Sequence, residues 1–368
     1  MSKKTKEKYL DIGPLLKTNA HYMLMFGERS SGKSYAVLYY ALKKYFEDGS
    51  ELGIIRRFDG DFVGQNSART YYESLMCNGL GENVIEELSH GEFVGVEYYG
   101  GKYFLYSLDK DGKAVRSQRV IAHGFSLASA EHYKGSQFPK IRTIMLDEFI
   151  ATRNYLTDEF MLFTSIVSTI VRDRDDVKIF LCGNSINVVN PYFREMGITN
   201  LKEMKKGTID VYEYGNSVLR VAVFYTDAPN KDKASNVYFA FNNPRLKMIT
   251  EGDWQLQSYP HCPCKYRPKD IVFTYIIVFE GETYQADIIL RGMMFFTYIH
   301  QKTTPIQDPD NDVIYSLEDD PRPNWHKYLT TPRTPVENKI VEFFRRNKVF
   351  YQDNMVGNAI DNYLQQCE

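Results

Sequence analysis

The sequence predicts an α/β protein: a domain with a parallel central sheet, then a linker region and a smaller α+β domain. Two observations predict the first domain. A glycine-rich segment at 27–34 lies between a short apolar run and a helix-like segment, and a later apolar run ends in two acids, Asp147 and Glu148. Three β-rich segments with tight turns after residue 270 predict the second domain. The expected boundaries are 1–206, 207–265 and 266–368.

Length and composition agree with a globular protein of two domains. The 368 residues exceed the usual size of one core, and 43% of them are hydrophobic. The net charge of −2 gives no global basic field, so any contact with nucleic acid has to come from local patches or from several copies acting together. Five scattered cysteines argue against a disulfide framework. No segment resembles a signal peptide or a membrane span, so we expect an intracellular protein without membrane contact.

Residues 22–46 have the order of a phosphate-binding site. Tyr22–Phe26 is an apolar run suited to a buried parallel strand, and Ser34–Phe46 has the pattern of a helix. Between them, GERSSGKS fits G-x-x-x-x-G-K-[ST], the P-loop or Walker A motif. The candidate nucleotide-binding residues are Gly27, Arg29, Ser30, Ser31, Gly32, Lys33 and Ser34.

The chemistry explains these residue types. Gly27 and Gly32 let the backbone turn and present its N–H groups to phosphate oxygens, next to the positive end of the following helix. Lys33 is expected to reach the β- and γ-phosphates, and the Ser34 hydroxyl to hold Mg²⁺. The motif therefore predicts a site for ATP with Mg²⁺.

A second motif follows a predicted strand at 52–57 and a predicted hairpin insertion within 92–125. The run IRTIMLDE, residues 141–148, is an apolar strand that ends in two acids, as Walker B requires. Asp147 can hold the Mg²⁺ of the nucleotide, and Glu148 can act as the general base for the attacking water. A glutamate at this place is typical of additional-strand catalytic-glutamate (ASCE) ATPases.

The chain then continues with a helix at Thr157–Val171 and a buried strand at Val177–Cys182. Asn184 follows this strand, which we expect between the P-loop and Walker B strands. It is a candidate sensor of the γ-phosphate, and a turn-forming asparagine is an equally good interpretation.

The second domain is expected to contain a three-stranded antiparallel meander within 270–300 and two final helices, 335–346 and 354–366. Two metal-like patterns have simpler interpretations. His261–Cys264 lacks a second ligand pair and is interpreted as a turn rather than a zinc site, and the acidic residues at 308–312 as a solvated loop rather than a calcium site.

Five segments together resemble the DNA-packaging (encapsidation) ATPases of small podoviruses, the Picovirinae type. They are GERSSGKS, IIRR, TIMLDEFI, VRDRDDVKIFLCGNS and VVNPYF. The resemblance implies a homo-oligomeric ring, a pentamer, that pumps double-stranded DNA into a prohead and contacts the viral portal and a packaging RNA. It also implies a location in the host cytoplasm, transiently at the portal vertex of the prohead.

The same resemblance implies two residues that act in trans. Arg172 matches an arginine finger that completes the active site of the neighbouring subunit, and Lys134 matches a second basic residue with such a role. By themselves, Arg172 could balance the dipole of the helix that it ends, and Lys134 could be a solvated loop lysine.

The last domain looks like the RNase H-like nuclease domain of larger terminases, without the nuclease carboxylates. The expected first strand, 271–279, has no acid, Glu280 lies in the turn and Asp287 is alone on the next strand. We interpret it as a degenerate nuclease domain, and Lys265, Arg267, Lys269 and Arg291 as candidate contacts with nucleic acid. The alternatives are another nucleic-acid ATPase ring, such as a helicase, and a terminase large subunit with an active nuclease.

Overall fold

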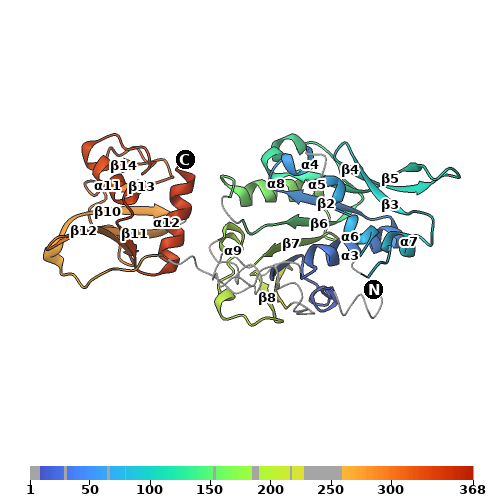
Figure 1. The fold of residues 1–368 in the computed structure, drawn as a ribbon, viewed down its shortest axis with the longest axis horizontal. Helices are drawn as coiled ribbons and strands as arrows, with labels where there is room; N and C mark the ends of the chain where they lie inside the picture. The colour runs from blue at the N-terminus through green and yellow to red at the C-terminus, as the bar shows by residue number, and fades with distance from the viewer. Residues whose placement is uncertain are drawn as a thin grey trace. The chain divides into compact units, whose positions relative to one another are not determined.

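The computed structural model describes residues 9–28, 31–63, 67–78, 80–151, 155–184, 190–215, 218–227, 259–279 and 281–367. The chain divides into two compact units, Met1–Trp254 and Gln255–Glu368. Each unit contains a sheet of its own (Figure 1).

The sheet of the first unit has nine strands in its described residues, in the order β3-β4-β5-β2-β6-β7-β1-β9-β8. The strands from β5 to β9 in this order run parallel, whereas β3, β4 and β8 pair antiparallel at the edges. The strands are β1 (Tyr22–Gly27), β2 (Glu51–Arg56), β3 (Gly95–Tyr99), β4 (Lys102–Leu108), β5 (Ala114–Ser126), β6 (Ile141–Asp147), β7 (Lys178–Asn184), β8 (Ile209–Glu213) and β9 (Arg220–Thr226).

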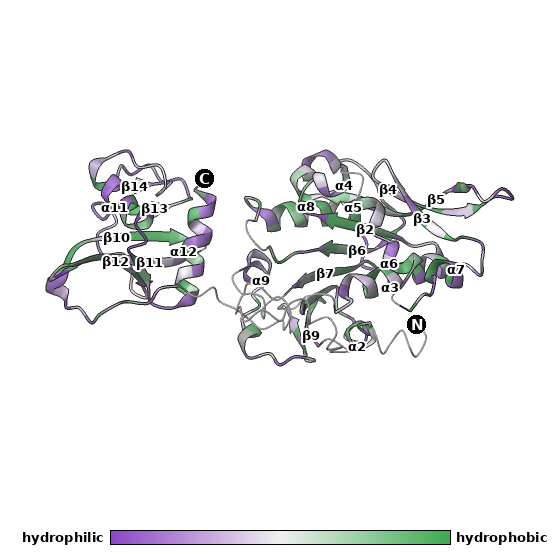
Figure 2. Ribbon diagram, in the orientation of Figure 1, coloured by the Kyte–Doolittle hydropathy of each residue, from purple (hydrophilic) through white to green (hydrophobic). Residues whose placement is uncertain are grey.

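Helices cover both faces of this sheet, which explains why its central strands are continuous apolar runs. Met25 of β1 belongs to the same buried cluster as Leu38 of α3 (Lys33–Asp48). The next residue, Phe26, belongs to the cluster of Phe163 on α8 (Glu159–Val171). Alternate strand residues therefore face opposite helical layers, and Figure 2 shows the hydrophobic central strands.

One short helix precedes the first strand, and others connect the strands that follow. They are α2 (Gly13–Leu16), α4 (Gly60–Val63), α5 (Ser67–Thr70), α6 (Glu73–Met76), α7 (Val84–Leu88), η1 (Leu127–Tyr133), α9 (Pro191–Glu195) and η2 (Asn200–Lys202). The predicted hairpin is present as β4 and β5, but β5 also pairs parallel with β2. The hairpin is thus an extension of the parallel sheet rather than a separate insertion.

The first unit extends further along the chain than the sequence pattern predicts. We expect a linker from residue 207 to 265, but β8 and β9 lie within this range, and β9 pairs in parallel with β1 from Tyr22↔Val221 to Gly27↔Thr226. The physical reason is that β1, a central apolar strand, needs a neighbour on each side, and β9 supplies the second. The boundary between the units falls after Trp254.

The second unit contains a sheet with the order β14-β13-β10-β11-β12-β15. The predicted meander forms its centre, and β13 and β14 extend it in parallel on one side, as in the RNase H-like fold. The elements are η4 (Pro268–Asp270), β10 (Ile271–Phe279), β11 (Glu282–Arg291), β12 (Met294–Gln301), β13 (Ile314–Ser316), β14 (Trp325–His326), α11 (Pro335–Arg345), β15 (Val349–Tyr351) and α12 (Asn354–Gln366).

Candidate active site

The phosphate-binding loop joins β1 to α3. Gly27 ends β1 with φ 150°, and a Cβ there would lie 2.3 Å from Thr226 Oγ1 on β9. Gly32 precedes α3 with φ 84°, in the left-handed region that favours glycine. Both glycines are therefore required by the backbone. Arg29 and Ser30, two further candidates from the motif, lie outside the described residues.

Lys33 lies inside this loop. Its Nζ donates to the carbonyl oxygen of Glu28 at 2.7 Å and to Ser31 Oγ at 3.0 Å. Lys33 and Ser31 are buried, and burial lowers the pKa of Lys33 to about 8. At neutral pH the side chain is still mainly protonated, so the loop holds a cation where a triphosphate needs one.

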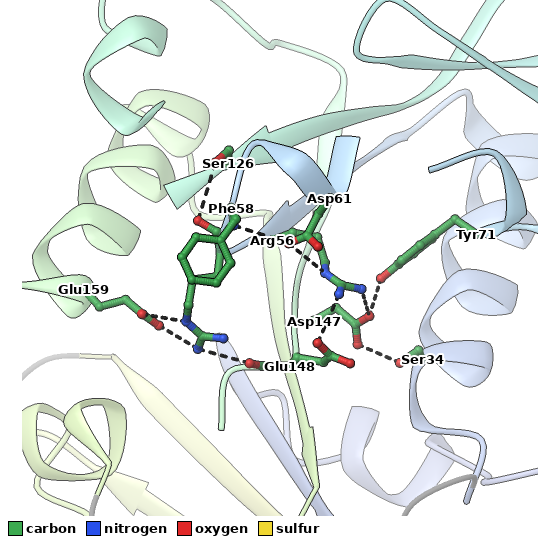
Figure 3. A network of polar contacts seen from close by, with 10 residues as sticks. Ser34, Arg56, Phe58, Asp61, Tyr71, Ser126, Asp147, Glu148 and Glu159 are labelled. Carbon is green, nitrogen blue, oxygen red and sulfur yellow. Dashed lines mark hydrogen bonds and ion pairs between the residues drawn. The ribbon is translucent and has the colours of Figure 1, made fainter. Parts of the chain in front are cut away.

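Ser34 and Asp147 meet between α3 and β6 (Figure 3). Ser34 Oγ donates to Asp147 Oδ1 at 2.8 Å, and Tyr71 Oη donates to Asp147 Oδ2 at 2.7 Å. Within the described ranges, no three His, Cys, Asp or Glu side chains gather closely enough to hold a metal. Mg²⁺ in nucleotide sites needs only one or two protein oxygens beside phosphate and water, so this hydroxyl–carboxylate pair fits it.

Arg56 connects the two acids of the second motif. It ends β2, the neighbour of β6, and its Nη1 and Nη2 lie 3.1 Å from Asp147 Oδ2 and 3.0 Å from Glu148 Oε2. Glu148 follows β6 with φ 59°, and 56% of its side chain is exposed. The Glu148 carboxylate is therefore open to solvent at the carboxyl edge of the parallel strands, where it can contact a water molecule.

Asn184 lies one strand away from the loop. As expected, β7 lies between β1 and β6, and Asn184 pairs in register with Gly27. Two residues earlier, Cys182 pairs in register with Asp147. Burial raises the pKa of the Cys182 thiol well above its usual value, so this side chain contributes no charge beneath the site.

The two residues implied to act in trans lie apart from this group. Arg172 directly follows α8 with φ 49°, and its Nη2 donates to the carbonyl oxygen of Ser136 at 2.7 Å. Lys134 follows η1, is exposed and pairs with Glu131. Among the described contacts, neither basic side chain touches Lys33, Asp147 or Glu148 of the same chain.

Sequence reasoning assigned no role to several residues of this site. Arg56 ends the apolar strand β2 and Arg57 directly follows it, and Tyr71 lies on a short connecting segment. A pair of arginines at the end of a buried strand was the available signal, because buried charges need partners. The partners themselves are distant in sequence and are not indicated by any local pattern.

Among the described residues, the sheet of the second unit holds one buried acid, Asp287. Asp287 of β11 accepts hydrogen bonds from Thr274 Oγ1 at 3.0 Å and Gln285 Nε2 at 2.9 Å, and His300 Nε2 lies 3.4 Å away. Burial raises the pKa of Asp287, but bonds from His300, Gln285 and Thr274 more than offset this and lower it overall. The Asp287 carboxylate is thus ionised, and neighbouring side chains already donate hydrogen bonds to its oxygens. Glu280 lies outside the described residues.

The four candidate nucleic-acid contacts of this unit, Lys265, Arg267, Lys269 and Arg291, are all exposed. Among the described residues, no helix is both long and apolar enough to cross a membrane.

Fold and site together define a class of protein. A P-loop between β1 and α3, acids at the tip of β6 and an added strand β7 between them form the ASCE type of P-loop domain, here followed by an RNase H-like unit. The sequence model of the podovirus DNA encapsidation protein (Gp16) family matches residues 5–366, and the chain belongs to this family.

Relatives and solved structures agree with this assignment. The DNA packaging proteins of Bacillus phages PZA and phi29 are each 22% identical to this chain, over 80% of its length and 78% of theirs. The structure is similar to the bacteriophage Phi-29 viral genome packaging motor assembly, with a TM-score of 0.59 and 16% identity over 98% of this chain and 99% of that chain. The Phi-28 gp11 DNA packaging motor gives a TM-score of 0.58, also at 16% identity, and covers 98% of both chains.

Proposed function

We propose that this protein is the ATPase of a viral DNA-packaging motor, which hydrolyses MgATP to move double-stranded DNA into a prohead. The observation that carries the proposal is the 2.8 Å contact between Ser34 Oγ and Asp147 Oδ1, because it joins the phosphate-binding loop to the acidic strand tip. Membership in a DNA encapsidation family supports DNA as the cargo.

The roles of the residues follow from their places. Backbone N–H groups of 27–34 and the ammonium of Lys33 bind the phosphates. Ser34 and Asp147 hold the Mg²⁺ of MgATP, which neutralises charge on the phosphate oxygens. Glu148 accepts a proton from the attacking water, and Asn184 senses the γ-phosphate.

Arg172 completes the site of a neighbouring subunit. It follows the 13 residues of α8, a helix about 20 Å long. The helix begins beside Glu148 and Phe149, which directly follow β6 and are called the catalytic loop below. An arginine at the far end of such a helix is poorly placed for its own nucleotide, which supports action in trans within a ring. Lys134 belongs to the same set of proposed trans-acting residues.

The partners of this motor are double-stranded DNA, the viral portal, a packaging RNA and further copies of the chain in a pentameric ring. The similarity to structures of viral packaging motors supports a place in such an assembly, and the family resemblance implies the portal, the RNA and the pentameric ring. The place of action is the host cytoplasm, transiently at the portal vertex of the prohead.

The test measures Mg²⁺-dependent ATP hydrolysis by the protein alone, with single-stranded DNA, and with proheads plus double-stranded DNA. We expect a strong rise only in the last mixture, and no hydrolysis by Lys33→Ala in any of them. Equal stimulation by single-stranded DNA without proheads would instead favour a helicase-like ring.

A further inference from the structure

Arg57 forms a buried ion pair beside the catalytic loop. It directly follows β2, and its Nε and Nη2 donate to the two carboxylate oxygens of Glu159 at 2.7 and 2.9 Å. Only 9% of Arg57 and 2% of Glu159 are exposed. Glu159 is the first residue of α8, so the pair fixes the start of this helix to the end of β2.

The same guanidinium also holds the backbone of the proposed general base. Arg57 Nη2 donates to the carbonyl oxygens of Glu148 at 3.2 Å and Phe149 at 3.3 Å. Glu148 has φ 59°, a conformation that side-chain-bearing residues adopt only when their surroundings impose it. Arg57 supplies donors to the two carbonyls at this turn, and the turn determines the direction in which the Glu148 side chain leaves the chain.

The rest of the network leaves neither charge unsatisfied. Tyr192 Oη donates to Glu159 Oε1 at 2.9 Å, and the backbone N–H of Leu156 donates to Glu159 Oε2 at 2.8 Å. A buried ion pair loses its hydration, and an apolar pair of similar volume is often as stable. Stability alone therefore does not explain the Arg57–Glu159 pair. Its contact with the backbone of Glu148 and Phe149 indicates a functional role instead.

We propose that Arg57 is a positioning residue for ATP hydrolysis: it holds Glu148 in its reactive orientation and ties the catalytic loop, through Glu159, to the helix that ends at Arg172. The inference rests on the proposed function. A shift of α8 would displace Glu159 and hence Arg57. The position of α8, which Arg172 follows, and the orientation of Glu148 are therefore linked within one subunit.

Arg57→Lys is the informative variant, because it keeps the charge but loses the planar fork that binds the carboxylate and both carbonyls. We expect kcat to fall by about 10- to 100-fold, the range that a small displacement of a catalytic group produces. The Kd for MgATP should stay within about twofold, since Arg57 does not touch the P-loop. Arg119→Lys, at an exposed arginine 3.9 Å from Glu92, is the matched control and should behave as wild type.

Glu159→Gln tests the helix side of the link with a side chain of the same shape, and we expect a similar loss of kcat. In a Glu148→Gln background, Arg57→Lys should cause no further loss in single-turnover rate, because the group that it positions is already absent. A further tenfold loss there, or a wild-type kcat for both single variants, would overturn the inference. If wild-type protein shows no ATP hydrolysis with proheads and DNA, the proposed function fails instead.

Should Arg57→Lys unfold, as seen in a lost melting transition, Glu159→Gln decides the question. This variant keeps the shape of the side chain but removes the charge that pairs with Arg57, so it weakens the link to α8 while Arg57 itself stays in place. A reduced kcat with unchanged MgATP affinity supports the link, and unchanged kcat overturns it.

Discussion

At the scale of the residue, the two carboxylate oxygens of Asp147 have different partners and different uses. Its Oδ1 accepts a hydrogen bond from Ser34, while its Oδ2 accepts hydrogen bonds from Tyr71 and Arg56. One side of the carboxylate thus faces a hydroxyl that can share a cation with it, and the other side is held by fixed donors. Arg56 also pairs with Glu148, so one guanidinium balances both acids.

Lys33 leads to a prediction about pH. Burial lowers its pKa to about 8 in the free protein, and a bound triphosphate favours the protonated form. Above about pH 8, binding must therefore take up a proton, and the Kd for MgATP should rise up to about tenfold per pH unit. Isothermal titration between pH 7 and 9.5 measures this. Lys33→Arg stays charged and should give a flat profile, and a flat profile for the wild type would contradict the prediction.

Glu148→Gln should bind MgATP as tightly as the wild type but lose turnover by about 10²- to 10⁴-fold, because only the activation of water is removed. Fluorescent-nucleotide binding and phosphate release measure the two effects separately. Normal turnover by this variant would remove Glu148 from the mechanism.

At the scale of the element, the site depends on which strands are neighbours. Parallel pairing brings the tips of β1, β7 and β6 to one edge, and β9 packs so closely on β1 that Thr226 Oγ1 lies 3.1 Å from the carbonyl oxygen of Phe26. This close approach explains why residue 27 is glycine. The start of the P-loop is therefore shaped by a strand that lies almost 200 residues away in sequence.

The central sheet of the second unit leads to a prediction about nuclease activity. β10 has no acid, and the Asp287 carboxylate on β11 is occupied by neighbouring side chains. Two-metal nuclease chemistry needs several converging carboxylates, so we expect no cleavage of supercoiled plasmid in Mn²⁺ but weak binding of nucleic acid. Gel analysis measures cleavage. Linearisation by the full chain that disappears in Asp287→Asn would contradict this and revive the terminase-nuclease alternative.

At the scale of the whole molecule, the proposed role of Arg172 in trans predicts that ATP hydrolysis depends on the formation of a ring. Lys33 and Mg²⁺ cover only part of the charge that spreads over the γ-phosphate oxygens in the transition state. An arginine finger is worth roughly 10³–10⁵ in rate, or about 4–7 kcal/mol. We therefore expect Arg172→Ala to bind MgATP but hydrolyse it slowly.

Mixing two inactive variants tests this arrangement. A subunit with Glu148→Gln still has Arg172, and a subunit with Arg172→Ala still has Glu148. Where the first donates its arginine to the second, one intact composite site forms. We expect the mixture to hydrolyse ATP faster than either variant alone. Full activity of Arg172→Ala by itself, or an inert mixture that demonstrably forms mixed rings, would count against the trans assignment.

The sequence by itself determined the elements and motifs whose signal is local. The P-loop, the strand that ends at Asp147, helix α8 and the antiparallel meander are each specified by one continuous segment of the chain, within 22–46, 141–148, 157–171 and 270–300 respectively. Patterns of this length reflect backbone geometry and side-chain periodicity, which act between near neighbours. The family resemblance also depended on such segments, and the family match confirms it.

Only the tertiary structure decided which distant residues meet. Ser34 and Asp147 are 113 residues apart in sequence, and Arg57 and Glu159 are 102 apart. Strand β9 has an ordinary β-rich sequence, and nothing local indicates that it belongs beside β1. Such pairings follow from the spatial order of the strands in the sheet and from the need of each buried charge for a partner. Both are properties of the complete fold.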